Sequence, residues 1–330
     1  MSAHEGYKPL QNFLDKFPKI SGNTVNGLGE KEERRPSPFF WHPHDRQTHG
    51  ELQTEVIDYH RQSAEMRKYF SSTPPGGRGP KPIEQSGVQV EKSANDWSAL
   101  IKQFALDNES DLVGITSMQP MYVYEGYTLD DPWVIIIAVA MNHDELNQAP
   151  ASFENPTAGA VVAKEYNRAS RASRELANFI LKQGYYAKAW PGPYASALSM
   201  MPAAIAAGIG QLGKHGSLIN KTYGSSIRLA AVTTNIPLIA DSQEDFGSED
   251  FCLNCQICTK ACPPGAISND KQTVRGVDKW YVDFDKCIPY FGETLACRIC
   301  IARCPWSKPG TGPRLSEKML KRRDRLTKTS

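Results

Sequence analysis

The sequence predicts an α+β protein in two main parts, a layered α/β body over residues 91–245 and a small cysteine-rich module over residues 246–312. Two observations carry this prediction. Segments with helical and strand-like apolar spacing alternate from residue 91 to about residue 240, which is typical of layered mixed folds. All eight cysteines follow this stretch and lie between positions 252 and 304. An N-terminal polar arm, residues 1–90, precedes the body, and a basic tail, residues 313–330, ends the chain.

The elements of the body follow from apolar spacing along the chain. A helix is expected around residues 97–104, and a short buried strand follows it at 111–116. Residues 133–141 read Trp-Val-Ile-Ile-Ile-Ala-Val-Ala-Met, are apolar on both faces, and so predict a central strand. A long helix is expected from about 158 to 183, with Gly184 as its stop. The remaining expected elements are a strand at 185–190, a small-residue helix at 197–207 and a strand at 226–234.

The first 90 residues are rich in proline, glycine and histidine and predict an arm that lies over the body. One helix is expected near residues 51–69, and a loose linker follows at 73–80. The arm also contains Trp-His-Pro-His-Asp, in which His42 and His44 precede His49. An H-x-H pair can bind a metal, whereas the flanking prolines favour an ordinary loop, and both interpretations stay open here.

The eight cysteines fall into two spaced sets. The first, over residues 252–262, reads C-x2-C-x2-C-x3-C and ends in proline, which is the run that wraps a cubane iron–sulfur cluster. The second repeats this order over residues 287–304, with its first gap widened to nine residues. In two-cluster ferredoxins the fourth cysteine of each run binds the other cluster. The spacing therefore predicts two [4Fe–4S] clusters, one held by Cys252, Cys255, Cys258 and Cys304, the other by Cys287, Cys297, Cys300 and Cys262.

Disulfides and zinc are the alternatives for so many cysteines. Disulfide frameworks are typical of short secreted chains, whereas here eight cysteines occupy one region of a 330-residue chain. Zinc would require two closed sets of four ligands, and proline after the fourth cysteine is typical of cluster loops rather than of zinc ribbons. The pattern therefore favours two cubane clusters.

The overall charge does not identify a partner. The chain has 38 Lys and Arg against 36 Asp and Glu, a formal net charge of +2, so neither nucleic acid nor an anionic membrane is demanded. Its longest apolar run, 133–141, is too short to span a bilayer, and residues 1–7 hold no apolar signal core. Arg34 and Arg35 precede prolines and aromatic residues instead of a twin-arginine signal core. We therefore expect a cytoplasmic protein with no membrane segment, and nucleic acid is disfavoured as a partner.

A glycine-rich stretch lies between the last helix and the last strand of the body. Residues 208–219 read Gly-Ile-Gly-Gln-Leu-Gly-Lys-His-Gly-Ser-Leu-Ile. Such dense glycines let the backbone approach a flat or bulky ligand, or make turns at positive φ. The stretch is not a dinucleotide fingerprint, because it follows a helix and precedes a loop and a strand. A ligand-approach loop is favoured over a structural turn, and its candidate contacts are Gly208, Gly210, Gly213, Lys214, His215 and Gly216.

With both parts in view, the chain resembles the corrinoid-dependent reductive dehalogenases and, more distantly, epoxyqueuosine reductase. The segment Phe-Asp-Lys-Cys-Ile-Pro-Tyr-Phe at 284–291 is similar to the sequences of the catabolic, cytoplasmic branch of the dehalogenases. The resemblance covers roughly residues 95–312. It is carried by residues 206–219, Tyr223-Gly224, 227–229, 235–238, 279–291 and 304–309.

The resemblance implies a base-off cobalamin between a nitroreductase-like body and a ferredoxin-like two-cluster module. Electrons would pass through the two clusters to cobalt, which removes a halogen from an aromatic or alkenyl carbon, and we expect a halogenated, halophenol-like aromatic substrate. The family's proton-donating tyrosine matches Tyr166, and the cation beside it matches Arg228. A cation there would stabilise the phenolate that remains after proton donation. Without the resemblance, Tyr166 would be interpreted as a core residue and Arg228 as half of a surface ion pair.

The chain also departs from the family pattern. The place of a further polar residue near the substrate reads Trp-Pro-Gly-Pro-Tyr at 190–194, where Tyr194 is the candidate. Longer catabolic members carry a flavin and [2Fe–2S] reductase part after the body, which is not found before Ser330. We therefore expect an external electron donor, such as a ferredoxin, a flavodoxin or a separate reductase. The basic tail is expected to be a solvated helix, with a docking patch for an acidic ferredoxin as the alternative.

Two other functions stay open at this stage. An epoxide reductase of the queuosine type would need a catalytic carboxylate, for which only Glu165, beside Tyr166, is available. A non-catalytic electron carrier or corrinoid chaperone would use both clusters without breaking a carbon–halogen bond. Bound corrinoid together with halide release separates the dehalogenase from the carrier, and dependence on tRNA identifies the epoxide reductase.

Overall fold

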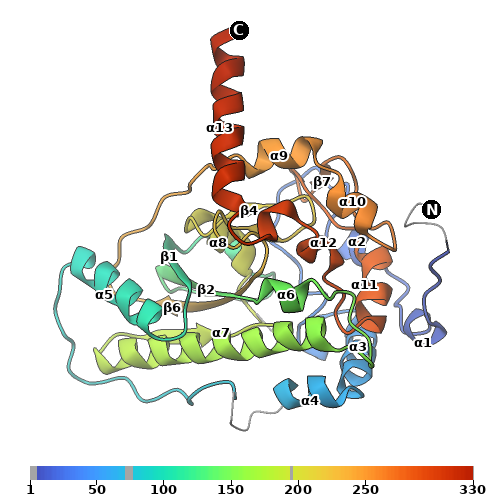
Figure 1. Ribbon diagram of the computed structural model, residues 1–330. Coiled ribbons are helices and arrows are strands. Elements are labelled where there is room, and N and C mark those ends of the chain that lie inside the picture. Colours follow the sequence, from blue (N-terminus) through green and yellow to red (C-terminus); the bar gives the residue numbers. More distant parts are fainter. Residues whose placement is uncertain (1–5, 71–76, 194–195, 330) are drawn as a thin grey trace.

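A four-stranded antiparallel sheet forms the centre of the body in the computed structural model, which describes residues 6–70, 77–193 and 196–329 (Figure 1). Every strand pairing is antiparallel, so the body is α+β and not a doubly wound parallel fold. Across the sheet the order is β1 (Leu112–Ser117), β2 (Trp133–Ala140), β6 (Ile227–Thr234) and β3 (Ala187–Trp190).

Strand β2 is the central strand that the sequence predicts. It pairs with β1 on one side and with β6 on the other, and residues 134–139 are buried. Because side chains alternate along a strand, β2 supplies two cores. Ile135, Ile137 and Val139 join one core, and Val134, Ile136 and Ala138 join the other.

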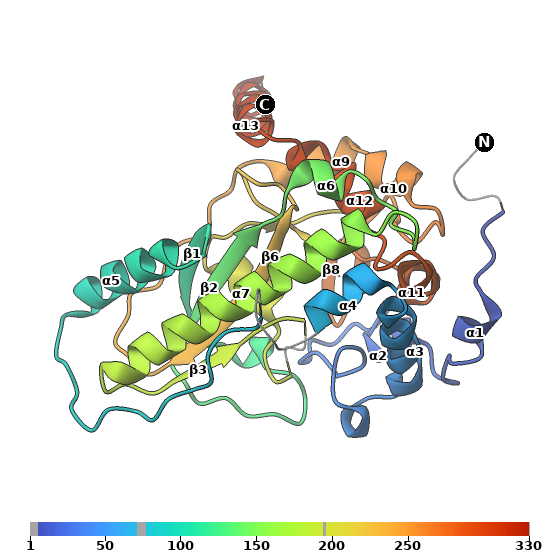
Figure 2. The ribbon, with the colours of Figure 1, turned by 60° about the horizontal axis from the view of Figure 1, so that its bottom comes forward.

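Helices cover both faces of this sheet. The long helix α7 (Thr157–Lys182) lies across it together with α5 (Ala94–Asp107), as Figure 2 shows. Helix α7 ends at Lys182, two residues before Gly184, whose φ of +84° agrees with its predicted role as the left-handed stop. The opposite face is covered by α8 (Met200–Ala206). Shorter pieces are α6 (His143–Leu146), η2 (Pro120–Tyr122) and the hairpin of β4 (Gln211–Leu212) with β5 (Leu218–Ile219).

The cysteine-rich module packs on one end of the body. Helix α10 (Ile257–Ala261) lies against α12 (Ile299–Ala302), and these two helices carry cysteines of both runs. Helix α11 (Phe284–Glu293) connects them to the hairpin of β7 (Gln272–Val274) with β8 (Val277–Lys279). The other elements are α9 (Ser248–Asn254), η3 (Pro305–Ser307) and the C-terminal helix α13 (Gly312–Thr329).

The N-terminal arm, which we expected to lie over the body, is folded and contacts both the cysteine-rich module and, through residues 64–70 and 78–90, helix α7 of the body. Phe13, Leu52 and Val56 form an apolar core with Ile288 of α11. The Gly29 N–H also donates to the Thr273 carbonyl of β7 (2.8 Å). Where one helix was expected there are two, α3 (Gly50–Arg61) and α4 (Ala64–Phe70). The arm further holds α1 (Gln11–Leu14), α2 (Gly22–Val25) and η1 (His44–Arg46).

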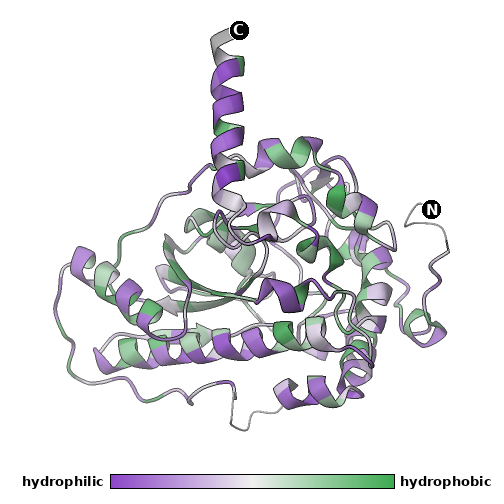
Figure 3. Cartoon of the chain, viewed as in Figure 1, coloured by the Kyte–Doolittle hydropathy of each residue, from purple (hydrophilic) through white to green (hydrophobic). Residues whose placement is uncertain are grey.

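The hydropathy of the helices agrees with their positions in the fold. Figure 3 shows α7 with hydrophobic and hydrophilic faces, and α13 almost wholly hydrophilic where it extends beyond the body. Within the described ranges, no helix has both the length and the apolar character needed to cross a bilayer.

Candidate active site

The main cavity lies where the body, the cysteine-rich module and the arm meet. Its volume is about 640 Å³, within the range of small-molecule and cofactor sites. All three parts supply wall residues, so the cavity exists only in the assembled chain. The residues with polar or ionisable side chains that line it include Tyr166, Arg228, His215, Arg298 and four cysteines, Cys262, Cys287, Cys297 and Cys300, and the backbone of Gly216 lines it as well.

Tyr166 and Arg228 meet in this cavity, as the family resemblance implies. Helix α7 presents Tyr166, and β6 presents Arg228 from a position paired with Val139 of β2. The guanidinium carbon of Arg228 lies 5.5 Å from the centre of the Tyr166 ring. Both side chains are partly buried, and burial lowers the pKa of Arg228, while the charges of Tyr166 and Cys300 act the other way. The pair is therefore set into the wall between the body and the module.

Arg228 is not part of a surface ion pair. Its Nη1 donates to the Ile227 carbonyl (2.9 Å), and its buried Nε has no hydrogen-bond partner. Among the described residues no carboxylate pairs with it. A buried donor without a partner is costly unless a ligand satisfies it. Arg228 is thus placed to hold an acceptor or an anion inside the cavity.

The Tyr166 ring packs closely on Gly192. A Cβ atom added at Gly192 would lie 2.7 Å from Cε1 of the Tyr166 ring, so a larger residue there would displace the ring. Tyr194, the candidate for a further polar residue, lies outside the described residues.

A second guanidinium, which the sequence analysis did not single out, faces the same space. Arg298 starts α12 with a φ of +85°, and Nη1 donates to the Ala296 carbonyl. Its guanidinium carbon lies 5.0 Å from the centre of the Phe291 ring. Burial, with the like charge of Arg228, lowers the pKa of Arg298 to about 10. The Cys-x-x-Cys spacing put this residue beside a cluster, but nothing in the sequence showed that its side chain enters the cavity.

His215 is held in one orientation by two hydrogen bonds. The Ser217 N–H donates to Nδ1 (3.2 Å), so we assign the ring proton to Nε2, which donates to the Ser225 hydroxyl (3.0 Å). Burial lowers the pKa of His215 to about 4, so the ring is neutral at physiological pH. Because both nitrogens are engaged, His215 is not free to ligate a metal.

Most of the glycine-rich stretch serves packing within the protein. A Cβ at Gly208 would lie 2.5 Å from the Ser242 carbonyl oxygen, and one at Gly210 would lie 2.3 Å from the Ile219 carbonyl oxygen. A Cβ at Gly213 would lie 2.7 Å from Ile219 Cδ1. At these three positions the structural-turn interpretation has the better support. Gly210 lines a separate cavity of about 360 Å³.

Lys214 does not line the main cavity, whereas His215 and Gly216, which follow it, do. The buried Lys214 side chain places Nζ 4.9 Å from the centre of the Trp280 ring, and its backbone N–H points to the Cys252 thiol. Only His215 and Gly216, of the six candidate contacts, line the main cavity. Their role as cofactor contacts stays a prediction.

The eight cysteines are free thiols, and the sequence predicts two ligand sets among them. We call Cys252, Cys255, Cys258 and Cys304 set I, and Cys262, Cys287, Cys297 and Cys300 set II. Burial, and then the charges of the other three members of set I, raises the pKa of Cys304 to about 12. Burial, and then Cys297 and Cys262, raises the pKa of Cys287 to about 12. The last thiol of each run thus lies beside the first three of the other run.

Single-ion sites are not supported by this geometry. Within the described ranges, no three His, Cys, Asp or Glu side chains come together as they would around one metal ion. Ligands of a cubane each bind a different iron, so they lie farther apart than ligands of a single zinc ion. The thiol spacing therefore fits a cluster better than zinc.

The histidines of the arm have separate partners. His44 Nε2 contacts the Thr54 hydroxyl, and His49 Nδ1 contacts the Thr48 hydroxyl, both at 2.9 Å. His42 is buried with its ring centre 4.4 Å from that of Tyr124. This arrangement supports the loop interpretation.

The two sets of thiols face different surroundings. All four cysteines of set II line the main cavity, and none of set I does. Set II therefore lies next to Tyr166 and Arg228, with set I farther out. Such an order suits electron transfer from the surface, through set I and set II, to the cavity.

Comparison with known proteins agrees with this architecture. Residues 251–308 match the family described as 4Fe-4S dicluster domain. The tetrachloroethene reductive dehalogenase of Sulfurospirillum multivorans is 34% identical over 185 residues, which cover 53% of this chain and 35% of that protein. An epoxyqueuosine reductase of Cyclobacterium marinum is 33% identical over 122 residues, 32% of this chain and 36% of the relative.

The fold has a counterpart among solved structures. A catabolic reductive dehalogenase in complex with 3-bromo-4-hydroxybenzoic acid superposes with a TM-score of 0.69 at 21% identity, over 93% of this chain and 47% of that one. The predicted α+β fold, the two-cluster module and the resemblance to reductive dehalogenases are thereby confirmed. The chain spans about a third of the length of the curated relatives it matches. Fold and site together define an iron–sulfur protein with the reductive dehalogenase fold.

The crossed pairing of the cysteines predicts different outcomes for two double variants. Cys262→Ser with Cys287→Ser removes two ligands of one cluster, so about four iron atoms per chain should remain. Cys262→Ser with Cys255→Ser removes one ligand from each cluster and should perturb both. Iron analysis and anaerobic EPR of the reduced proteins distinguish them. If the second variant keeps one intact cluster and the first perturbs both, each run holds its own cluster and the crossed pairing is wrong.

Proposed function

We propose that this protein is a cobalamin-dependent reductive dehalogenase, in which two [4Fe–4S] clusters deliver electrons to a corrinoid in the main cavity. The observation that carries the proposal is the convergence of Tyr166, Arg228 and the set II thiols on that cavity. The reaction replaces the halogen by hydrogen. It consumes two electrons and one proton and releases a halide ion.

The walls of the cavity fit a corrinoid. They are formed by both the body and the module, and their polar groups include the buried Arg228 Nε that has no partner in the protein. His215 would contact the corrinoid without binding its metal, since both ring nitrogens are engaged. This suits a cobalamin bound without a protein imidazole ligand. When bound, the reduced corrinoid supplies the electrons that cleave the carbon–halogen bond.

Tyr166 is proposed as the proton donor. Its ring lies on the cavity wall, and Arg228 beside it stabilises the phenolate that remains once the proton has left. A positioned acid of this kind contributes about 10²- to 10⁴-fold to a rate. Gly192 keeps the ring in place because no side chain intrudes there.

The two guanidinium groups support an anionic aromatic substrate. The charge of Arg228 is close enough to lower the pKa of Arg298, and no carboxylate pairs with either among the described residues. Like charges so placed favour an anion between or beside them. A phenolate or a carboxylate on a halogenated ring provides this charge. A relative of known structure was solved with 3-bromo-4-hydroxybenzoic acid, which agrees with the proposal.

The epoxide reductase alternative finds no support in the position of Glu165. This side chain is buried away from the cavity and pairs with Arg168 (3.4 Å), which in turn pairs with Asp111 (2.9 Å).

We also propose a reducing compartment, the cytoplasm, because all eight cysteines are free thiols that must be available to iron.

Replacement of the proposed proton donor tests this function. Tyr166→Phe should lower halide release from a bromophenol about 10²- to 10⁴-fold, while corrinoid content and cluster reduction stay unchanged. Tyr186→Phe is the control, because Tyr186 is 41% exposed and does not line the cavity. The assay is anaerobic, with methyl viologen as reductant. If Tyr166→Phe releases halide as fast as the control, Tyr166 is not the donor.

The second guanidinium can be tested through substrate charge. Arg298→Gln should lower kcat/KM for a bromophenolate or bromobenzoate about 10- to 100-fold, mainly through KM, because a charge-assisted hydrogen bond is lost. The rate with an uncharged haloalkene should change little. The matched control is Arg67→Gln, because Arg67 is exposed and does not line the cavity. Equal losses with charged and uncharged substrates would contradict a substrate-binding role and indicate an effect on the neighbouring cluster.

A further inference from the structure

The surface outside set I combines exposed apolar side chains with the route to a cluster. Cys255 is partly exposed, whereas Cys252, Cys258 and Cys304 are buried. Two residues away on either side of Cys255 lie Leu253, 55% exposed, and Ile257, 45% exposed. Apolar residues this exposed beside a redox centre are typical of a contact surface.

Unpaired cations flank the same thiols. Lys260 follows Ile257 by one helical turn on α10, and Arg303 precedes Cys304 directly, at the end of α12. Lys308 follows shortly after η3. All three are exposed, and none has a side-chain partner among the described residues. Because α10 packs on α12, these positive charges gather at the end of the molecule that carries set I.

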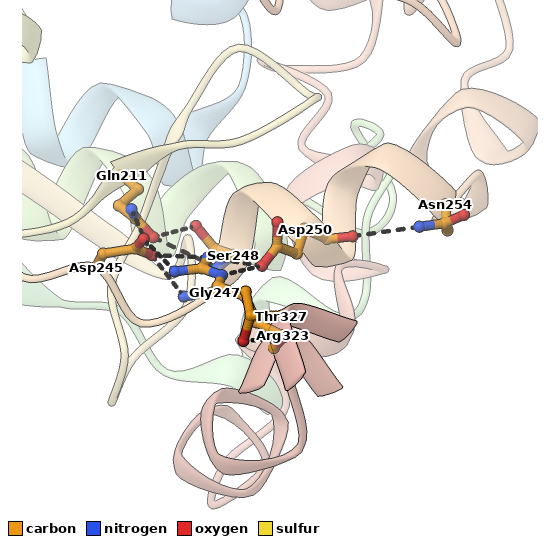
Figure 4. A network of polar contacts seen from close by, with 8 residues as sticks. All are labelled: Gln211, Asp245, Gly247, Ser248, Asp250, Asn254, Arg323 and Thr327. Atoms are coloured by element: carbon orange, nitrogen blue, oxygen red, sulfur yellow. Dashed lines mark hydrogen bonds and ion pairs between the residues drawn. The ribbon is translucent and has the colours of Figure 1, made fainter. Parts of the chain in front are cut away.

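The acidic groups nearby are already neutralised. Glu249 pairs with Lys271, and Asp250 pairs with Arg323 of α13 (2.6 Å). Arg323 also binds Asp245 (2.6 Å), and Figure 4 shows how this network ties α13 to the start of α9. The free charge on this surface is therefore positive.

Helix α13 extends the positive surface. Its inner face holds the buried Ser316 and Met319, and Met319 packs on Gly247. On the opposite face, four basic residues follow helical spacing and form a stripe along one side, Arg314, Lys318, Lys321 and Arg325. Lys321 also pairs with Glu317. Figures 1 and 3 show this hydrophilic helix rising from the end of the molecule that carries α9.

We infer that this surface docks an acidic one-electron carrier protein, which reduces the set I cluster. The docking surface consists of Leu253, Ile257, Lys260, Arg303, Lys308 and the basic stripe of α13. Each encounter transfers one electron, so the donor is oxidised and the cluster is reduced, with no bond made or broken. The inference deepens the proposed function, because it identifies the partner that supplies its electrons.

An acidic carrier explains the surface better than RNA or a membrane does. RNA or anionic lipid would need only the basic stripe, and neither would need exposed apolar residues around a redox thiol. Complementary charge speeds the encounter of two proteins, and a small apolar contact holds them while the electron passes. The docking surface has both the positive charges and the exposed apolar side chains.

The test measures cluster reduction in the cluster-loaded protein. A reduced plant-type [2Fe–2S] ferredoxin, an acidic protein, is mixed anaerobically with the wild type and with the Lys260→Glu, Arg303→Glu double variant. The second-order rate constant should fall about 10-fold or more at low ionic strength, and salt should close the difference. Reduction by methyl viologen radical should be unchanged. The control is Lys182→Glu, an exposed lysine at the far end of α7, and Leu253→Asn tests the apolar part separately.

Several outcomes would overturn the inference. Equal ferredoxin rates in the double variant and the control would do so, as would an equal loss of rate with methyl viologen. An Arg314→Glu, Lys318→Glu variant that loses binding to an RNA hairpin or to phosphatidylserine vesicles, with ferredoxin rates unchanged, would assign α13 to that other partner. No halogenated substrate is present, so a failure of the dehalogenase assay would leave this result standing.

Discussion

The side-by-side arrangement of the two cysteine runs is the constraint on which the rest of the structure depends. The last thiol of each run lies beside the first three of the other, so each predicted cluster would join both runs. Burial raises the pKa of Cys252 and of Cys258 to about 11, so without iron these thiols stay protonated at neutral pH. Thiolates are the ligands that iron requires, and cluster assembly must therefore release protons. Folding of the module and binding of iron are linked in this way.

The module forms one wall of the main cavity and brings two cations into it. Arg298 enters because it follows Cys297 directly at the start of α12, and Arg228 enters from β6 of the body. Burial lowers the pKa of both guanidinium groups, and the charge of Arg228 lowers that of Arg298 further. Nearby negative charge opposes this lowering, either from the cluster thiolates or from a bound anion. The cations to which we assign the proposed anionic substrate would therefore also stabilise the site beside set II.

Much of the fold and part of the site could be predicted from the sequence. The central strand β2, the end of α7 and the cluster module could be predicted because each depends on a local pattern. These patterns are the unbroken apolar run of β2, the glycine after α7 and the spacing of the cysteines. The packing of the arm was not predictable in this way. Its core residues, among them Phe13, Leu52 and Val56, are widely spaced in a polar sequence, and their core is completed by Ile288, far away in the chain. Arg298 and the packing glycines were missed for the same reason, because side-chain direction depends on tertiary contacts.

The central claim is that the cavity between body and module holds a corrinoid beside two cubane clusters. Anaerobic EPR of protein produced with cobalamin available tests it most directly. The expected result is a base-off Co(II) signal at about one per chain, together with the signals of two reducible [4Fe–4S] clusters. Two intact clusters with no bound cobalt after reconstitution would contradict it, and would identify the chain as an electron carrier.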